Sequence, residues 1–214
     1  MPDPGDSGRM RATVVTVHGW HMTGLEMLLL RRRLRHAGYE VRAFRYPSRR
    51  QTPEQAARRL AAYLEGVPGD VVHLVAHSLG GVVVRHLFAI APVQRPGRIV
   101  MLGSALAGSR AAALMARSRL GRLWLGAALD RGLLGGSPLL QGRSIGMIAG
   151  NRGLGLGSLL PTLLPQPHDG TVAVQETEAP DVIRHLQVPH GHFGLLLSPR
   201  VADAVIRFLK TGEF

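Results

Sequence analysis

The sequence predicts a three-layer α/β/α sandwich, in which helices cover both faces of a mostly parallel sheet of about six strands. Short apolar runs rich in β-branched residues alternate with segments whose apolar residues recur every three or four positions. This alternation is typical of parallel strands joined by right-handed helical crossovers. The chain has 214 residues, of which 45% are hydrophobic, so we expect one domain with a sizeable core over residues 1–214.

Each expected strand is a short apolar run bounded by polar residues, glycine or proline. The six runs are residues 12–17, 40–44, 71–76, 98–103, 144–150 and 181–187. The helices between them begin at residues with N-cap chemistry: Thr23 precedes a helix that stops at Gly38, and Thr52 precedes the next. Ser198 precedes the closing helix, and a proline follows directly after both Thr52 and Ser198.

Residues 104–143 differ from the rest of the chain because they are rich in leucine, alanine, glycine and arginine. We expect two short helices there, around residues 109–119 and 122–134. With the aperiodic stretch 151–167, they form either a small helical cap over the sheet or a layer packed against its edge. A cap would supply an apolar pocket for an acyl chain. The residues that suit such a pocket are Leu114, Met115, Leu120, Leu123, Trp124 and Leu125.

The composition limits the possible function classes. The chain has no cysteine, which excludes a disulfide framework, a thiolate metal site and a cysteine nucleophile. Residues 1–10 are expected to form a flexible tail, and they lack the basic-then-apolar order of a signal peptide. No apolar run reaches membrane-spanning length. We therefore expect a cytoplasmic protein.

The formal net charge of +12 has two interpretations. It indicates either an anionic partner, such as nucleic acid or a lipid surface, or a solvated basic face that follows from an arginine-rich composition. Aromatic residues make up only 5% of the chain, too few for a base-stacking platform, so we expect no nucleic-acid partner. A solvated face is the first expectation, and weak association with an anionic membrane surface is the second.

The most informative stretch joins the third strand to the helix after it. Residues 71–81 read VVHLVAHSLGG, an apolar run followed by a small-residue turn with Ser78 at its apex. In such an elbow the serine hydroxyl lies above the strand end, and the first helical N–H groups point toward whatever binds there. Ala76 replaces the first glycine of the usual Gly-x-Ser-x-Gly pattern. The alternative is a serine N-cap on an ordinary helix.

Other polar groups follow strand ends, and the carboxyl ends of parallel strands share one edge of the sheet. Asp169 follows the fifth strand and His192 follows the last. Ester hydrolysis needs a nucleophile, a base, a carboxylate that orients the base, and donors for the developing oxyanion. We expect Ser78, His192 and Asp169 to fill the first three roles. The backbone N–H groups of Leu79 and Trp20 would form the oxyanion hole.

Each assignment has a rival. His190 is an alternative base, and it lies close enough in sequence to form a metal pair with His192, although no carboxylate stands at a recognised ligand spacing. Asp169-Gly170 also suits a simple turn. The rival acids are Glu176, Glu178 and Asp181, whereas Asp70 lies at the wrong end of its strand. The histidines expected to be structural are His18, His73, His77 and His86.

Four stretches, in this order, resemble α/β-hydrolases, and within that fold the small bacterial lipases and esterases. They are Val-His-Gly-Trp (17–20), Ala-His-Ser-Leu-Gly-Gly (76–81), Asp-Gly-Thr-Val (169–172) and Gly-His-Phe-Gly-Leu-Leu (191–196). The resemblance spans the chain from about residue 12 to its end. In the minimal lipases of Bacillus type, a Gly-His-x-Gly-Leu-Leu stretch carries the catalytic histidine, which implies His192 rather than His190. Their acid stands in an Asp-x-x-Val context similar to that of Asp169.

The resemblance implies a serine hydrolase that cleaves small-molecule or lipid carboxylic esters through an acyl-enzyme on Ser78, without cofactor or metal. The same site would suit an acyl-thioesterase or acyltransferase. A third possibility is a non-catalytic lipid- or anion-binding protein on the hydrolase scaffold, because one fold hosts many functions.

Overall fold

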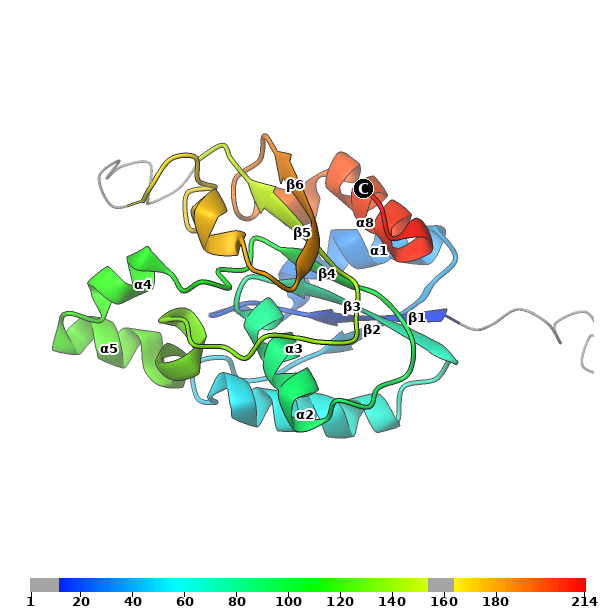
Figure 1. The fold of residues 1–214 in the computed structure, drawn as a ribbon, viewed down its shortest axis with the longest axis horizontal. Coiled ribbons are helices and arrows are strands. Elements are labelled where there is room, and N and C mark those ends of the chain that lie inside the picture. Colours follow the sequence, from blue (N-terminus) through cyan, green and yellow to red (C-terminus); the bar gives the residue numbers. More distant parts are fainter. Residues whose placement is uncertain (1–11, 154–163) are drawn as a thin grey trace, which may run out of the picture.

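The computed structural model describes residues 12–153 and 164–214, which form a three-layer α/β/α sandwich (Figure 1). The six strands are β1 (Ala12–Val17), β2 (Glu40–Phe44), β3 (Val71–His77), β4 (Ile99–Leu102), β5 (Ile145–Gly150) and β6 (Val182–Val188). Their order in the sheet is β2-β1-β3-β4-β5-β6, and every neighbouring pair is parallel. The predicted fold class is therefore confirmed. The predicted tail, residues 1–10, and residues 154–163 of the aperiodic stretch lie outside the described residues.

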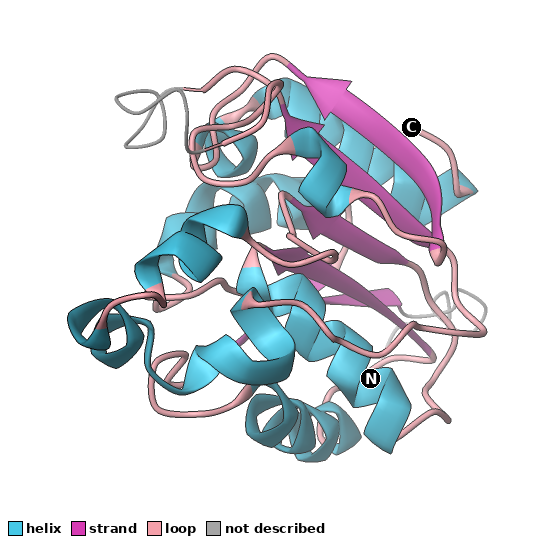
Figure 2. Ribbon diagram, turned by 60° about the vertical axis from the view of Figure 1, so that its left-hand side comes forward, coloured by secondary structure: helices cyan, strands magenta, loops and turns pink. Residues whose placement is uncertain are grey.

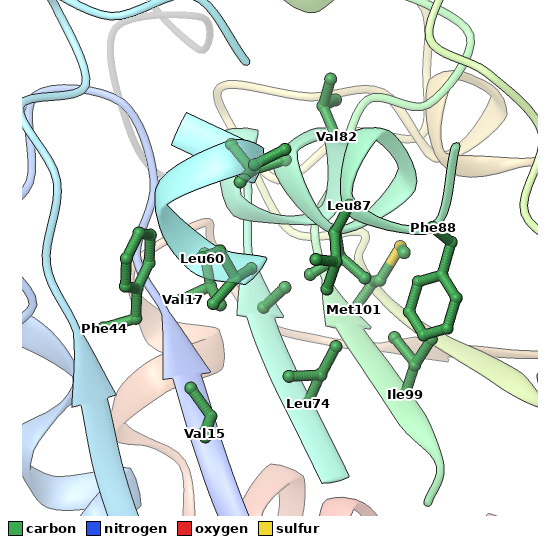
Figure 3. Close-up of a cluster of buried hydrophobic side chains, with 14 of the residues drawn as sticks. Val15, Val17, Phe44, Leu60, Leu74, Val82, Leu87, Phe88, Ile99 and Met101 are labelled. Carbon is green, nitrogen blue, oxygen red and sulfur yellow. The ribbon is translucent and has the colours of Figure 1, made fainter. Parts of the chain in front are cut away.

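Four long helices cover the two faces of the sheet (Figure 2). α2 (Pro53–Glu65) and α3 (Leu79–Ile90) pack on one face, and α1 (Leu28–His36) and α8 (Pro199–Thr211) pack on the other. The core on the α2–α3 side includes Leu60 and Leu87, which meet strand residues such as Val17 and Met101 (Figure 3). Because β3 and β4 are buried on both faces, their residues are almost all apolar, and His73 and His77 of β3 are the exceptions.

Three residues were predicted to be helix N-caps, and two of these predictions are confirmed. The Thr52 hydroxyl accepts a hydrogen bond from the Gln55 N–H, and the Gln55 side-chain oxygen accepts one from the Thr52 N–H, so a capping box opens α2. Ser198 caps α8 in a similar way. The prediction for Thr23 was wrong. A 3₁₀ turn over Leu25–Met27 begins after Gly24, whose φ of 90° breaks any helix from Thr23, and α1 follows this turn.

Residues 104–143, here called the cap segment, begin beyond the carboxyl ends of the strands and then return past α3 to the amino end of β5 (Figure 1). They contain α4 (Arg110–Met115) and α5 (Arg119–Leu125), with Ser109 and Ser118 as N-caps. The second helix begins earlier than predicted because Ser118 caps it by accepting from the Gly121 N–H. After α5 the chain continues as a 3₁₀ turn over Gly126–Ala128 and a π-helical turn over Leu129–Leu133.

The remaining helix is the short α7 (Gly194–Leu197), which follows β6 and packs against α1. No helix within residues 12–153 or 164–214 has both the length and the apolar character that crossing a membrane requires.

Candidate active site

Ser78 stands at the turn between β3 and α3 with φ 53° and ψ −124°. A positive φ is uncommon for a residue with a side chain and costs backbone energy, so the surrounding structure must hold it. The Ser78 N–H donates to the Leu102 carbonyl at 2.9 Å, which fixes the turn to the end of β4. Within the described residues the Ser78 side chain makes no capping hydrogen bond to α3, so the alternative of an ordinary N-cap is wrong.

The start of α3 lies very close to the end of β1 because residue 80 is glycine. A Cβ there would stand 2.4 Å from the Val17 carbonyl oxygen. The approach also brings the loop after β1 beside the nucleophile candidate, since a Cβ on Gly19 would lie 2.9 Å from the Ser78 Cβ. The predicted oxyanion donors therefore lie on both sides of Ser78. Neither the Leu79 nor the Trp20 amide has an acceptor among the described residues.

His18 holds the loop that carries the Trp20 amide. Its Nδ1–H donates to the Gly19 carbonyl at 2.9 Å, and its Nε2 accepts from the Tyr46 N–H at 3.3 Å. The Tyr46 hydroxyl donates to the His18 carbonyl at 3.0 Å, and the two rings are stacked. Burial lowers the pKa of His18, which favours the neutral ring that these bonds need. The prediction that His18 is structural fits this arrangement.

Asp169 and His192 come together although 22 residues separate them in the sequence. The His192 Nδ1–H donates to Asp169 Oδ2 at 2.6 Å, and both side chains are buried. The other carboxylate oxygen, Oδ1, accepts from the Thr171 and Val172 N–H groups at 2.9 and 2.7 Å. The His192 N–H also donates to the Asp169 carbonyl at 2.9 Å. The carboxylate is thus fixed on one side and available to orient the imidazole on the other.

His77 connects the elbow to the histidine loop. Its Nε2–H donates to the His192 carbonyl at 3.3 Å, and the centroids of the two rings are 4.6 Å apart. Ser78 therefore follows directly after a residue that touches His192. No hydrogen bond joins the Ser78 hydroxyl to the His192 ring, both of which lie in the described chain, and such catalytic bonds often tighten only with substrate.

The rival residues have other surroundings. The ring of His190 makes no hydrogen bond to any described residue. Glu176 accepts from the Arg110 and Ala173 N–H groups at 2.7 and 2.9 Å, and Asp181 forms an ion pair with Arg85. Glu178 and Asp70 are exposed. Residues 12–153 and 164–214 hold no group of three or more acidic or histidine side chains that could bind a metal ion.

Sequence reasoning missed the contact between the loop that carries Trp20 and the cap segment. The indole Nε1–H of Trp20 donates to the Leu125 carbonyl at 3.1 Å, and its ring meets the Trp124 ring edge-on at 4.4 Å between centroids. His21 contacts both rings: it meets the Trp20 ring edge-on and stacks on the Trp124 ring. The only available signal was that the chain contains just two tryptophans, one in each of these segments.

Solved structures with the same fold include several hydrolases. Bacillus licheniformis lipase BlEst2 in its mature form matches with a TM-score of 0.69 and 19% identity, covering 100% of this chain and 95% of that one. The metagenomic carboxyl esterase MGS0156 matches with a TM-score of 0.66 and 18% identity, covering 98% and 81%. Phospholipase PlaB from Legionella pneumophila matches with a TM-score of 0.55 and 20% identity, covering 79% and 46%. At these identities the likeness shows the fold.

No curated protein matches the sequence. The sequence model described as "Alpha/beta hydrolase family" matches residues 14–208, which include every strand of the sheet except the first two residues of β1. The elbow at Ser78, the paired Asp169 and His192, and this match over nearly the whole chain lead to one conclusion: the chain belongs to the alpha/beta hydrolase family.

Proposed function

We propose that this hydrolase cleaves carboxylic esters through an acyl-enzyme on Ser78. The observation that carries the proposal is the 2.6 Å hydrogen bond from His192 to the buried Asp169, beside a serine held at a strained elbow. A base oriented by a carboxylate, close to a half-buried serine nucleophile, is the arrangement that acyl transfer needs. The lipase and esterase names of the structural neighbours agree with an ester substrate.

In the acylation step, the Ser78 oxygen attacks the ester carbonyl carbon while His192 Nε2 takes the hydroxyl proton. The carbonyl oxygen becomes an oxyanion that accepts from the Leu79 and Trp20 N–H groups. Asp169 keeps the proton of the resting imidazole on Nδ1 and stabilises the imidazolium that forms. The tetrahedral intermediate then expels the alcohol, which receives its proton from His192 Nε2, and leaves the acyl group on Ser78.

In the deacylation step, a water molecule takes the place of the alcohol. His192 Nε2 removes a proton from the water, the hydroxide oxygen bonds to the acyl carbon, and the second tetrahedral intermediate releases the carboxylic acid. His192 returns the proton to Ser78. The two amide donors serve both steps without rearrangement, because they belong to the rigid backbone of the elbow and of the loop that His18 holds.

The first test is labelling with a fluorophosphonate, read by intact mass and peptide mapping. We expect one adduct on Ser78 in the wild type and in His190→Ala, and none in Ser78→Ala. Labelling of His192→Ala should slow by a factor on the order of a thousand. The assignment would be contradicted by an adduct on another residue or by the absence of labelling in folded wild-type protein. It would also be contradicted if, of the two histidine variants, only His190→Ala lost the labelling.

The second test compares substrates of matched acyl chains. If the protein is an esterase, kcat/KM should be higher for a p-nitrophenyl ester than for the corresponding acyl-thioester. Ser78→Ala should abolish the hydrolysis of both substrates. A strong preference for the thioester would move the assignment to acyl-thioesterase on the same residues. Transfer to an added alcohol in place of water would move it to acyltransferase.

A further inference from the structure

The outer face of α5 is apolar although it faces solvent. Leu120, Leu123 and Trp124 stand at helical positions i, i+3 and i+4, and their exposed fractions are 80%, 74% and 45%. The other side of the helix is buried through Leu125. The sequence had suggested Leu120 and Leu123 as lining for an acyl pocket, but the structure points them outward. An exposed apolar group on a water-facing helix marks a surface for interaction.

Three arginines flank this apolar face. Arg117, Arg119 and Arg122 are exposed, and none of them forms an ion pair with a described residue. The whole cap segment, residues 104–143, contains six arginines and a single aspartate, Asp130. We call the three arginines together with Leu120, Leu123 and Trp124 the cap patch. A surface that combines exposed leucine and tryptophan with exposed arginines is complementary to an anionic lipid–water interface.

The cap patch lies next to the candidate active site. Trp124 packs on Trp20, whose amide is the candidate oxyanion donor. A second exposed apolar side chain, Phe193, directly follows His192 and is 59% exposed. Figure 1 shows α4 and α5 beyond the strand ends, where the candidate site also lies. A flat surface touching the cap patch would therefore approach the mouth of the site.

We propose that the cap patch docks the protein on the surface of an anionic phospholipid membrane. Leu120, Leu123 and Trp124 would enter the headgroup region while the three arginines contact lipid phosphates and other anionic headgroup oxygens. This inference goes beyond the proposed function, because it concerns where the protein binds and holds whether or not Ser78 is the nucleophile. It also localises the weak membrane association that the net charge of +12 suggested.

Co-sedimentation of the full chain with vesicles tests the proposal, using Ser78→Ala protein so that lipid is not consumed. We expect binding to vesicles of equal parts phosphatidylglycerol and phosphatidylcholine, a steep loss of binding with added salt, and little binding to pure phosphatidylcholine. Replacing Arg117, Arg119 and Arg122 by glutamine should weaken binding about a hundredfold. The double variant Leu120→Ser/Leu123→Ser should weaken it by at least about tenfold.

Matched controls come from the rest of the surface. Arg200→Gln/Arg207→Gln removes two exposed arginines on α8, and Val93→Ser removes an apolar side chain that is 92% exposed in the loop after α3. Both variants should bind like the parent. Quenching of tryptophan fluorescence by brominated acyl chains should fall in Trp124→Phe. The proposal would be overturned if the protein did not bind the anionic vesicles, or if it bound pure phosphatidylcholine vesicles equally well. It would also be overturned if the cap-patch variants bound as tightly as the parent. A dimer in solution that the same substitutions dissociate would overturn it as well.

Discussion

At the scale of single residues, His77 joins the nucleophile candidate to the base candidate. Its Nε2–H donates to the His192 carbonyl, and its Nδ1 has no partner among the described residues. Burial, followed by the nearby charge of His192, lowers the pKa of His77 far below its ordinary value. The ring is therefore neutral in the physiological range, and it positions the histidine loop without adding a charge beside His192.

We predict that His77→Phe, which keeps a ring but removes the donor, lowers kcat/KM for an ester by about tenfold, the value of one net hydrogen bond. His77→Gln should recover most of this loss because its amide N–H2 can reach the same carbonyl. Steady-state kinetics on a soluble ester measure both variants. Equal losses in the two variants would mean that packing, rather than the hydrogen bond, explains the role of His77.

Gly103 limits the space around the paired acid and base. Its φ is 56°, and a Cβ there would stand 3.1 Å from both Asp169 Oδ2 and His192 Nδ1. We predict that Gly103→Ala lowers kcat by roughly tenfold or more, because a small displacement of this hydrogen bond misaligns the imidazole.

Gly142→Ala is the matched control for that variant, since Gly142 also has a positive φ (76°) but has open space around its Cβ position. Both variants should lose about 1 kcal/mol of stability from backbone strain, as measured by thermal unfolding. Only Gly103→Ala should lose activity. Similar activity losses in both would show that backbone strain, and not crowding of the pair, is responsible.

The candidate site residues carry local signals in the sequence, whereas the residues that surround them do not. Ser78, Asp169 and His192 could be found because each carries a local signal, such as the small-residue turn around Ser78. The roles of these residues stay predictions until the labelling is done. The contacts of His77 and Gly103 could not be foreseen, because they depend on how β4 and the loop after β6 meet in space.

At the scale of elements, the identity of the N-cap residue was enough to predict where a helix begins when a polar side chain bonds to the first turn, as at Thr52 and Ser198. It was not enough at Thr23, where the backbone of Gly24 decides it, nor in the cap segment after Leu125. There the chain is shaped by packing: a Cβ on Gly126 would lie 2.4 Å from the Arg49 carbonyl oxygen. Long-range approaches of this kind leave no periodic pattern in the sequence.

A buried ion pair anchors the cap segment to the sandwich. Arg85 on α3 pairs with Asp181 before β6, and their side chains are only 2% and 5% exposed. Arg85 also donates to the Ser137 hydroxyl at 3.0 Å, and Asp181 accepts from the Leu140 N–H at 2.9 Å. The end of the cap segment, α3 and the residue before β6 are thus joined by one pair of charges.

We predict that Asp181→Asn destabilises the protein by about 3–5 kcal/mol, because it leaves the Arg85 charge buried and unpaired. For a chain of this size the midpoint of thermal unfolding should fall by roughly 10 °C. Replacing both partners, as Arg85→Met/Asp181→Leu, should cost less than the single change. The exposed pair of Glu54 with Arg58 supplies the control, and Glu54→Gln should leave the midpoint nearly unchanged. A single variant as stable as that control would contradict the anchoring role.

At the scale of the whole molecule, the alternation of strands and helices predicted a parallel sheet with two covered faces. It did not predict the strand order, because β1 lies between β2 and β3 and the chain reverses direction across the sheet there. That reversal places the loop after β1 beside the elbow after β3, where ligands bind in open parallel sheets. The close approach of Gly19 to Ser78 is thus a consequence of topology, which no local pattern encodes.

Several histidines are buried in the folded protein, and we therefore predict that the fold loses stability in mild acid. Burial, and next the charges of Arg98 and Arg143, lower the pKa of His73 to about 4. His73 Nδ1 accepts from the Arg98 N–H at 2.9 Å, which requires the unprotonated nitrogen. Burial likewise lowers the pKa of His18, His77 and His86. A base with a depressed pKa in the folded state contributes stability that is present above its unfolded pKa, about 6.5, and lost as the pH falls toward its folded pKa.

For His73 alone, the loss between about pH 8 and about pH 5 is about 2 kcal/mol. We predict that His73→Asn, whose side-chain oxygen can still accept from Arg98 but does not titrate, reduces the acid-induced fall of the unfolding midpoint by roughly 4–8 °C. Thermal unfolding of both proteins at the two pH values measures the difference. His36→Asn, the same replacement at an exposed position of α1, is the matched control variant. An equal fall in His73→Asn and the wild type would show that His73 does not resist protonation in the folded state.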